Sequence, residues 1–258
     1  MSMIAPNACI QDATGYAPLA FRLAMAYQPI VDLHDGSVMA YEALVRGPHN
    51  QPASSILAQI NAGNRYAFDQ TCRVRAIETA ARLGLEASLS INFMPNAISQ
   101  PETCIRTTLH ACNRHGIAPD QIIFEITEAE KVENPVFLAR IANHYKELGF
   151  RTAIDDFGAG YAGLSLLANF QPDYVKLDME LVRDIHLSRA KQAIVKGMQK
   201  VCQDLAIEVI VEGVETRDEL DWFRELGFRY FQGYFFARPG FESLPLPDFA
   251  GLDAVPSL

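Results

Sequence analysis

The sequence lacks the long apolar runs and paired cysteines that mark membrane and secreted proteins. Within its 258 residues, no uncharged apolar run approaches the ~18 residues that a membrane-spanning helix needs. The N-terminus shows no basic start followed by a continuous apolar stretch, so it does not resemble a secretory signal. The five cysteines are odd in number and form no CxxC pair, which favours reduced thiols. We therefore expect a cytoplasmic protein without a membrane span.

Histidine motifs and positive charge are also scarce. The six histidines form no HExxH or HxxxH pattern, so histidine-centred zinc hydrolysis is not expected. Lys and Arg number 22 against 31 Asp and Glu, which gives a formal net charge of −9. Proteins that bind DNA or RNA usually carry the opposite excess, so we expect no nucleic-acid partner. A polyanionic ligand would need local help from a cation or a metal.

What is present is the composition and length of one large globular domain. Apolar residues make up 49% and charged residues 21% of the chain. Two apolar runs at residues 24–33 and 38–46 flank a turn, His34-Asp35-Gly36-Ser37, and predict an opening hairpin. We expect an N-terminal extension over residues 1–20 and a single domain over residues 21–258.

After the hairpin, strand-like and helix-like segments alternate. Strands are expected over residues 88–92, 122–126, 152–155, 174–177, 208–211 and 230–236. Helical spacing covers residues 54–85, 102–115, 135–148, 164–169, 188–205 and 217–226. This alternation is typical of a parallel sheet, and about eight strands in ~250 residues predict closure. The predicted fold class is α/β, a TIM-type (β/α)8 barrel in which the opening hairpin supplies one irregular, antiparallel strand.

Polar side chains gather in or just after the C-terminal halves of the predicted strands. They are Glu42, Asn92, Glu125, Asp155, Asp156, Lys176, Asp178, Glu212 and Gln232, with Glu128 and Glu215 just beyond their strands. The C-terminal ends of barrel strands converge on one mouth, where active sites are built. Both faces of a barrel strand are covered, so a carboxylate inside one needs a partner. The sequence therefore predicts one polar site at the mouth.

The residue types at this site favour a hard metal ion. Glu42, Asn92, Glu125, Asp155 and Asp156 offer only oxygen ligands, which suit Mg²⁺ or Mn²⁺ rather than zinc. Four carboxylates exceed what one Mg²⁺ usually takes from protein, so two ions are expected, as in enzymes that displace groups at phosphorus. An enolase-type barrel with a lysine base would use similar residues. That class carries a capping domain, for which the residues before the first strand leave no room.

At this point the residues resemble a known family, the bacterial EAL domain. The resemblance rests on an ordered set of motifs across residues 21–239. They are Gln28-Pro29-Ile30, Glu42-Ala43-Leu44-Val45-Arg46, Ser90-Ile91-Asn92, Glu125-Ile126-Thr127-Glu128, Asp155-Asp156-Phe157-Gly158, Lys176-Leu177-Asp178, Glu212-Gly213-Val214-Glu215-Thr216 and Gln232-Gly233-Tyr234. The resemblance implies a cyclic di-GMP-specific phosphodiesterase that uses two Mg²⁺ or Mn²⁺ ions and produces linear pGpG.

The resemblance also implies roles for individual residues. Glu42, Asn92, Glu125 and Asp155 correspond to ligands of a first metal, and Asp156 to a ligand of a second. Glu212 resembles the general base or a further metal ligand, Lys176 the group that positions the water, and Gln232 a polar support. Gln28, Arg46 and Asp178 resemble substrate contacts, and Glu128 and Glu215 resemble supports of neighbouring loops. Family members also form homodimers and carry sensor domains, so both are expected partners.

A catalytically silent module is the alternative within the same family. Such a protein would bind cyclic di-GMP as a receptor or would dock another protein. Family members of that kind typically lose one or more of the acidic ligands, whereas this sequence keeps every one. The retained carboxylates favour the enzyme, because nothing but function obliges a chain to hold so many acids together.

Overall fold

The computed structural model describes residues 19–98, 100–127, 135–159 and 163–249. Its strands are β1 (Ala24–Asp32), β2 (Ser37–Arg46), β3 (Ser88–Asn92), β4 (Ile122–Thr127), β5 (Arg151–Phe157), β6 (Tyr174–Leu177), β7 (Glu208–Val211), β8 (Tyr230–Phe231) and β9 (Gly240–Phe241). Its α-helices are α1 (Ala53–Leu57), α2 (Arg65–Arg82), α3 (Pro101–His115), α4 (Pro135–Glu147), α5 (Gly163–Asn169), α6 (Met179–Val182), α7 (Arg189–Asp204) and α8 (Arg217–Glu225). Three 3-10 turns complete the set, η1 (Pro95–Ala97), η2 (Pro119–Gln121) and η3 (Ile185–Leu187).

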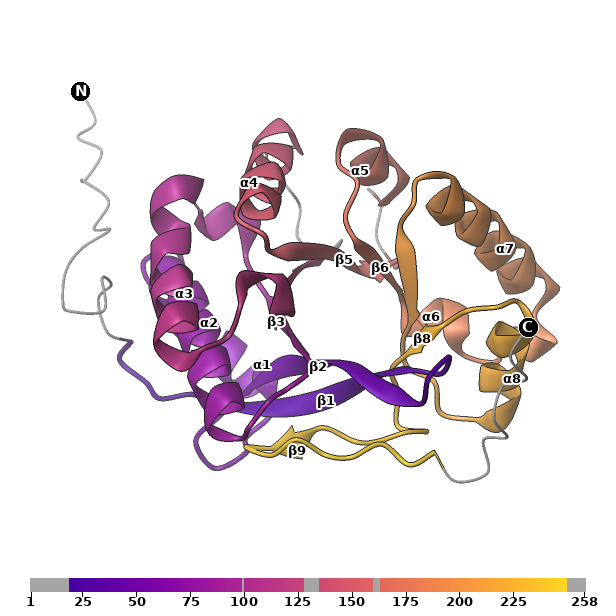
Figure 1. Cartoon of the computed structure of the whole chain (residues 1–258), viewed down its shortest axis with the longest axis horizontal. Helices are drawn as coiled ribbons and strands as arrows, with labels where there is room; N and C mark the ends of the chain where they lie inside the picture. The colour runs from indigo at the N-terminus through magenta and orange to yellow at the C-terminus, as the bar shows by residue number, and fades with distance from the viewer. Residues whose placement is uncertain (1–18, 99, 128–134, 160–162, 250–258) are drawn as a thin grey trace.

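Strands β1 to β8 close into a barrel, as the alternation predicts. Neighbouring strands from β2 to β8 pair in parallel, whereas β1 pairs antiparallel with both β2 and β8 and so closes the ring. The predicted antiparallel strand is thus confirmed as β1. Figure 1 shows the larger helices on the outside of the strands and β9 along the outer side of β1. We call the end where β2 to β8 finish the barrel mouth.

The C-terminal segment over residues 240–249, which we call the C-terminal strap, packs against the opening hairpin. Strand β9 pairs with Ala26 and Tyr27 of β1. The chain beyond it supplies the carbonyl of Pro245, which accepts a hydrogen bond from the Tyr41 hydroxyl at 3.1 Å. The strap thus joins α2, whose Ala76 carbonyl accepts a hydrogen bond from the Tyr27 hydroxyl at 2.9 Å, in covering the outer face of the hairpin.

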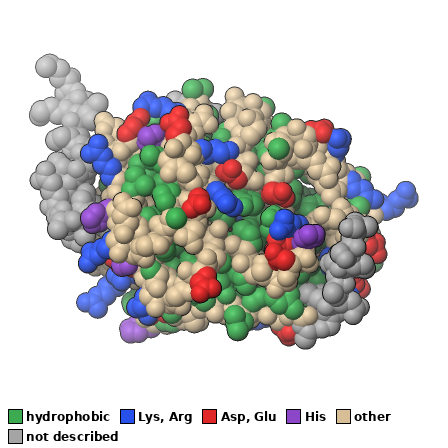
Figure 2. All heavy atoms as spheres, in the orientation of Figure 1, with side chains coloured by type: hydrophobic (Ala, Val, Ile, Leu, Met, Phe, Trp, Pro, Cys, Tyr) green, Lys and Arg blue, Asp and Glu red, His purple; other side chains and the backbone are tan. Residues whose placement is uncertain are grey.

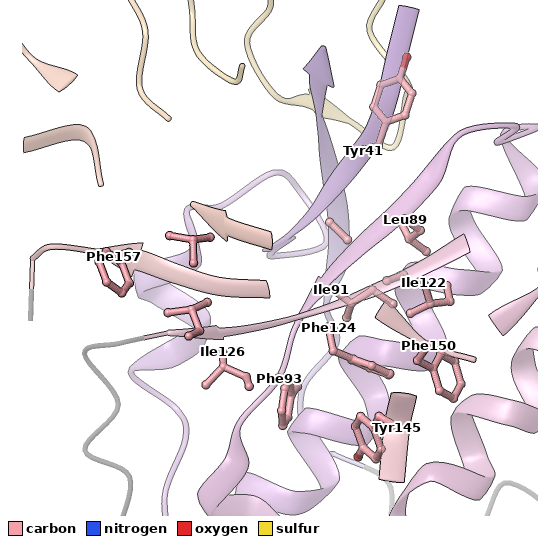
Figure 3. Close-up of a cluster of buried hydrophobic side chains, with 14 of the residues drawn as sticks. Tyr41, Leu89, Ile91, Phe93, Ile122, Phe124, Ile126, Tyr145, Phe150 and Phe157 are labelled. Carbon is pink, nitrogen blue, oxygen red and sulfur yellow. The ribbon is translucent and has the colours of Figure 1, made fainter. Parts of the chain in front are cut away.

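Most of the core lies between the barrel and the surrounding helices. Figure 3 shows part of it, where Phe124 of β4 and Phe93, which directly follows β3, meet Tyr145 of α4 and Phe150. The rings of Phe124 and Tyr145 have centroids 4.9 Å apart, and those of Phe124 and Phe150 are 5.2 Å apart in an edge-on arrangement. Aromatic pairs in such arrangements add to the stabilisation that burial alone provides.

The barrel interior is built in two layers of different chemistry. A smaller apolar cluster, the plug, fills the end away from the mouth with Ile30, Ala40, Ile123, Ala153, Tyr174, Ile210 and Tyr230. On the strands that point toward the mouth, a polar residue follows each plug residue after two positions: Glu42, Glu125, Asp155, Lys176, Glu212 and Gln232. On the antiparallel β1 the polar residue, Gln28, comes two positions earlier. Residues two apart share a strand face, so the plug forms a floor for the polar layer.

Two predicted elements differ from the structure. The helical stretch expected over residues 54–85 is divided into α1 and α2. Asn61 and Asn64 lie in the break, and their side-chain oxygens accept hydrogen bonds from the backbone N–H groups of Gly63 and Asn61. Such local bonds compete with helix formation. The last strand, expected to reach residue 236, ends at Phe231 because the chain turns at Gly233, where a Cβ atom would lie 2.0 Å from the Val214 carbonyl oxygen.

None of the helices in the described part of the chain combines the length and apolarity that crossing a membrane requires. On the face shown in Figure 2, acidic and basic side chains are interspersed. Residues 1–18 of the predicted N-terminal extension and residues 250–258 of the predicted domain fall outside the described residues, so the division at residue 20 stays a prediction.

Candidate active site at the barrel mouth

A single buried ammonium group lies at the centre of the polar layer. The side chain of Lys176 is 1% exposed. Its Nζ lies 2.7 Å from Glu212 Oε1, 2.9 Å from Asp155 Oδ1 and 3.0 Å from Glu125 Oε2. A fourth carboxylate oxygen, Glu42 Oε2, is 3.5 Å away. Strands β2, β4 and β5 and the end of β7 thus deliver four carboxylates to the lysine of β6, an arrangement that the barrel makes possible.

Glu42 is held by amide side chains from both sides. Asn92 Nδ2 donates to Glu42 Oε1 at 3.0 Å, and Gln232 Nε2 donates to Glu42 Oε2 at 2.7 Å. Gln232 Nε2 also lies 3.4 Å from Gln28 Oε1. Gln28 Nε2 in turn donates to the carbonyl of Ala237 at 3.1 Å. This chain of hydrogen bonds joins the site to the segment that leads into the C-terminal strap.

Two consecutive aspartates reach the same site because strand β5 is irregular at its end. Side chains of consecutive strand residues normally point to opposite faces. Here the pairing of β5 with β6 shifts register between Ile154 and Phe157, and Asp156 has a left-handed backbone with φ of 54°. A bulge of this kind re-aims a side chain. As a result, ligand oxygens of Asp155, Asp156 and Glu212 all lie within 4.8 Å of one another.

Burial and crowding of like charges shift the acid–base properties of the site. Burial raises the pKa of Glu125 and of Glu212 well above the usual range, although Lys176 opposes the shift. Burial and the neighbouring Asp155 raise the pKa of Asp156 to about 6. Burial alone would lower the pKa of Lys176, but the surrounding carboxylates raise it well above its usual value. The lysine is therefore charged at neutral pH, and the carboxylates compete for it.

The donor set fits divalent metal ions. Glu125 Oε2 and Asp155 Oδ1 are buried and lie within ion-pair distance of Lys176, yet they accept no hydrogen bond from any described residue. Asp155, Asp156 and Glu212 offer further oxygens in a compact group. Carboxylate oxygens left without donors are what a hard cation takes up. Glu42, Asn92, Glu125, Asp155, Asp156 and Glu212 are the residues that could hold it.

A cavity of about 230 Å³ opens from this cluster to the surface. Its lining includes Asp178 and Glu215 from the predicted set, together with Met179, Gly213 and Tyr234. The Tyr234 side chain is 48% exposed, and Arg238 lies over its ring at 4.2 Å from the centroid. An exposed aromatic ring beside a polar cavity offers a flat surface for a planar ligand group.

Some predicted residues are not joined to the cluster. Arg46, at the mouth end of β2, donates from Nη1 to the neighbouring Val45 carbonyl at 2.8 Å and does not line the cavity. Asp178 lines the cavity, but its Oδ1 also accepts from the backbone N–H of Glu180 and caps α6. Glu128 lies outside the described residues, so its predicted role in supporting the loop stays a prediction.

Sequence reasoning assigned no role to Ser90, which the structure places in the site. Its hydroxyl donates to Glu125 Oε1 at 2.5 Å, and the residue is fully buried. Ser90 lies two positions before Asn92 on β3, so the two side chains share the inward face. That spacing is the signal in the sequence that could have identified it.

Comparison with known proteins settles the family. The family model described as "EAL domain" matches residues 16–239. The chain belongs to the EAL domain family. Among curated EAL relatives, the blue light- and temperature-regulated antirepressor BluF of Escherichia coli is 34% identical over 85% of this chain. The probable cyclic di-GMP phosphodiesterase PdeG, also of E. coli, is 30% identical over 83% of this chain. The chain spans 55% of the length of BluF and 44% of that of PdeG.

Solved EAL structures share the fold closely. A standalone versatile EAL protein from Vibrio cholerae, solved with c-di-GMP bound, is 52% identical with a TM-score of 0.87, and the match covers 89% of this chain and 97% of that one. BlrP1 of Klebsiella pneumoniae, solved as a manganese and c-di-GMP complex, is 39% identical with a TM-score of 0.81. That match covers 88% of this chain and 59% of BlrP1. These likenesses agree with the TIM-type barrel predicted from the sequence.

Proposed function

We propose that this EAL domain is a cyclic di-GMP phosphodiesterase that opens the ring to linear pGpG with the help of two Mg²⁺ or Mn²⁺ ions. The observation that carries the proposal is the position of four carboxylates within 3.5 Å of the buried Lys176 at the barrel mouth. The names of NbdA from Pseudomonas aeruginosa and of PdeG, both cyclic di-GMP phosphodiesterases, support it.

The charge of the site supports the number of ions. Glu42, Glu125, Asp155, Asp156 and Glu212 bring five negative charges when ionised, against one positive charge on Lys176. Two divalent cations would balance the remaining four. The ligand would add two phosphodiester charges, which an uncompensated acidic site would repel. When bound, two such ions polarise phosphoryl oxygens and lower the pKa of water, which suits in-line displacement at phosphorus.

The residues of the chain itself then have distinct tasks. Glu212 accepts the proton of the attacking water as the water oxygen bonds to phosphorus and the bond from phosphorus to the sugar 3′ oxygen breaks. The 3′ oxygen takes a proton from solvent water as it leaves, and Glu212 returns its proton to the solvent. Lys176, charged and fixed by its carboxylate neighbours, stabilises negative charge as it develops and orients the water. Asn92 and Gln232 hold the two oxygens of Glu42 in place by hydrogen bonds.

Recognition of the substrate falls to the rim of the cavity. Gln28 and Asp178 are proposed as substrate contacts at the rim and Arg46 as a clamp on a phosphate, with Glu215 supporting the loop beside them. For Arg46 this requires its side chain to leave the Val45 carbonyl and turn toward the mouth. The exposed ring of Tyr234 is suited to stacking on a guanine base.

The cellular setting is also a proposal. Cys72, Cys104, Cys112 and Cys202 are buried and form no disulfide within the described residues, which fits a reducing compartment such as the cytoplasm. We propose a homodimer, as the resemblance implies, and regulation by a sensor domain or separate partner. The chain matches only part of most curated relatives, which fits the presence of such regulatory regions in those proteins.

A silent module is the second candidate, favoured by one observation. BluF, whose name describes an antirepressor, is 34% identical to this chain. An EAL domain of this kind would bind a protein and would have no need of the metal site. The buried carboxylates of this chain weigh against it, because each is costly to bury without a task.

Product formation decides between the two. Purified protein is incubated with cyclic di-GMP and Mn²⁺ or Mg²⁺, and pGpG is followed by chromatography. Glu42→Ala removes a carboxylate that contacts Lys176, Asn92 and Gln232, whereas Glu147→Ala removes an exposed carboxylate on α4 and serves as the control. We expect product from the wild type and Glu147→Ala but not from Glu42→Ala. Nucleotide binding without product would indicate a receptor, and neither binding nor product would favour protein docking.

A further inference from the structure

A buried carboxylate outside the metal site ties together two loops that carry site residues. Glu219, in the first turn of α8, is 0% exposed. Its Oε1 accepts from the backbone N–H of Asp184 at 3.1 Å and lies 3.4 Å from Arg183 Nη1. Its Oε2 accepts from the backbone N–H groups of Glu215 at 3.0 Å and Thr216 at 3.1 Å. One side chain therefore receives four hydrogen bonds from two separate loops.

Two of the four hydrogen bonds to Glu219 belong to an ordinary helix cap, and the other two do not. Thr216 is the N-cap of α8, and its hydroxyl accepts from the Glu219 N–H, which with the returning Glu219 bond forms a capping box. A capping box needs only residues next to the helix. The bonds to Arg183 and Asp184 come from residues more than thirty positions earlier in the chain. They add nothing to the cap, so they point to a second task.

The two loops that meet at Glu219 both begin in the active site. One follows β6, which carries Lys176, and runs through Asp178 and α6 to Asp184. The other follows β7 and contains Glu212 and Glu215. The loops are also in tight contact, since a Cβ atom on Gly213 would lie 2.5 Å from the Cβ of Met179. Glu212 is the first residue of the second loop, and its backbone N–H donates to the carbonyl of Leu177 at the end of β6 at 3.2 Å.

Hydrogen bonding and backbone geometry favour a fixed contact between the two loops at Glu219, which we call the junction. Burial disfavours the charged form of Glu219, but hydrogen bonds from the backbone N–H groups of Glu215, Asp184 and Thr216 outweigh it and lower the pKa of its carboxyl group. Asp184 has a left-handed backbone, with φ of 53°, that costs free energy unless its surroundings hold it. Arg183 also lies 2.8 Å from Glu215, which lines the cavity. The pair of Arg183 and Glu215 thus links the junction to the lining of the cavity.

We propose that Glu219 is a positioning residue that locks the loop after β7 onto the segment after β6 and so fixes Glu212 opposite Lys176. This inference rests on the proposed function, because Glu212 is one of the residues whose carboxylate oxygens would hold a metal ion. Loss of the junction lets Glu212 drift from Asp155 and Asp156, and the affinity for divalent cations falls with it.

The variant Glu219→Gln tests the proposal. It keeps the size of the side chain, but an NH₂ group replaces an oxygen that accepts two hydrogen bonds, so at least one loop must detach. Three quantities are measured on each protein. Calorimetry gives the Mn²⁺ affinity, turnover of cyclic di-GMP gives kcat and KM, and thermal unfolding in metal-free buffer gives the Tm. Asp221→Asn is the matched control, because it makes the same chemical change on the same helix in an exposed pair with Arg217. We expect Glu219→Gln to lose about tenfold in Mn²⁺ affinity, with a lower kcat and little change in KM, and Asp221→Asn to match the wild type.

The possible failures can be told apart. A wild type that neither binds Mn²⁺ nor hydrolyses the nucleotide overturns the proposed function itself. A wild type that does both, with Glu219→Gln equal to Asp221→Asn in Mn²⁺ affinity and kcat, overturns the positioning role, even if the Tm falls. Should Glu219→Gln not fold, Arg183→Met decides, since that side chain is 32% exposed and the backbone bonds of the cap survive its loss. Weaker Mn²⁺ binding by Arg183→Met supports the junction, and unchanged binding counts against it.

Discussion

Asp69 and Arg73 form an ion pair of 2.7 Å in which neither side chain is more than 1% exposed. The Arg73 guanidinium is enclosed by the rings of Phe93 and Phe124, at 5.3 and 5.1 Å from their centroids. Asp69 also accepts a hydrogen bond from the backbone N–H of Met94 at 2.9 Å. Met94 lies two residues beyond Asn92, so a fully buried charge pair on α2 anchors the end of the strand that delivers this predicted ligand.

This anchor leads to a prediction for stability. Arg73→Met leaves Asp69 charged and unpaired in the core, and we expect a loss of about 3–5 kcal/mol in the free energy of unfolding. The double variant Asp69→Leu with Arg73→Met removes both charges and should recover part of that loss. Urea denaturation of both proteins measures the difference. A single variant that unfolds at the same urea concentration as the wild type would contradict this account.

Lys176 should matter more for turnover than for binding. Lys176→Ala removes the ammonium that four carboxylates surround, and loss of such charge stabilisation costs about 10²–10³ in kcat. The dissociation constant for cyclic di-GMP, measured on the same protein in Ca²⁺, should change much less. Lys200→Ala, at an exposed pair with Asp204, is the control. Equal losses in kcat and in binding would sink the chemical role of Lys176.

The raised pKa of Asp156 predicts a pH dependence in the metal-free protein. The folded state keeps the proton of Asp156 up to about pH 6, whereas the unfolded chain releases it near its ordinary value of 3.8. The folded state thus binds more protons in this window, and the contribution of Asp156 to stability falls as the pH rises through it. Asp156→Asn removes this penalty. In EDTA, the Tm of Asp156→Asn relative to the wild type should be higher at pH 7 than at pH 4.

Mn²⁺ should reverse that trend in the wild type. Metal binds the deprotonated carboxylate in the folded state alone, so the gain in Tm on adding Mn²⁺ should be larger at pH 7 than at pH 5. Asp156→Asn should show a smaller gain at pH 7. In EDTA, a difference in Tm between the wild type and Asp156→Asn that is the same at pH 4 and at pH 7 would contradict the raised pKa of Asp156.

Much of the fold follows from patterns that the sequence displays. The period of two along the strands places a polar residue two positions from each plug residue, and the strand–helix alternation predicts that these positions meet in one barrel. The antiparallel hairpin is visible in its short turn at His34-Asp35-Gly36-Ser37. These signals are local, and each depends on only a few neighbouring residues.

The remainder depends on contacts between distant parts of the chain. The left-handed backbone of Asp156 follows from the register that β5 and β6 adopt together. The end of β8 follows from the approach of Gly233 to Val214. The sequence around Glu219 predicts only a capping glutamate. Its other two hydrogen-bond donors, Arg183 and Asp184, lie 36 and 35 residues earlier in the chain. No short window of sequence contains that information.

The antiparallel course of β1 has a consequence for how this domain can be joined to others. Ala24, the first residue of β1, pairs with Arg46, the last residue of β2. In a barrel whose strands all run the same way, the first strand would begin at the opposite end. Here any chain attached ahead of β1 arrives at the barrel mouth, beside the cavity. A regulatory module fused on that side, as proposed above, would be within reach of the opening and would obstruct or expose the cavity by moving as a rigid body, with no signal passed through the barrel wall.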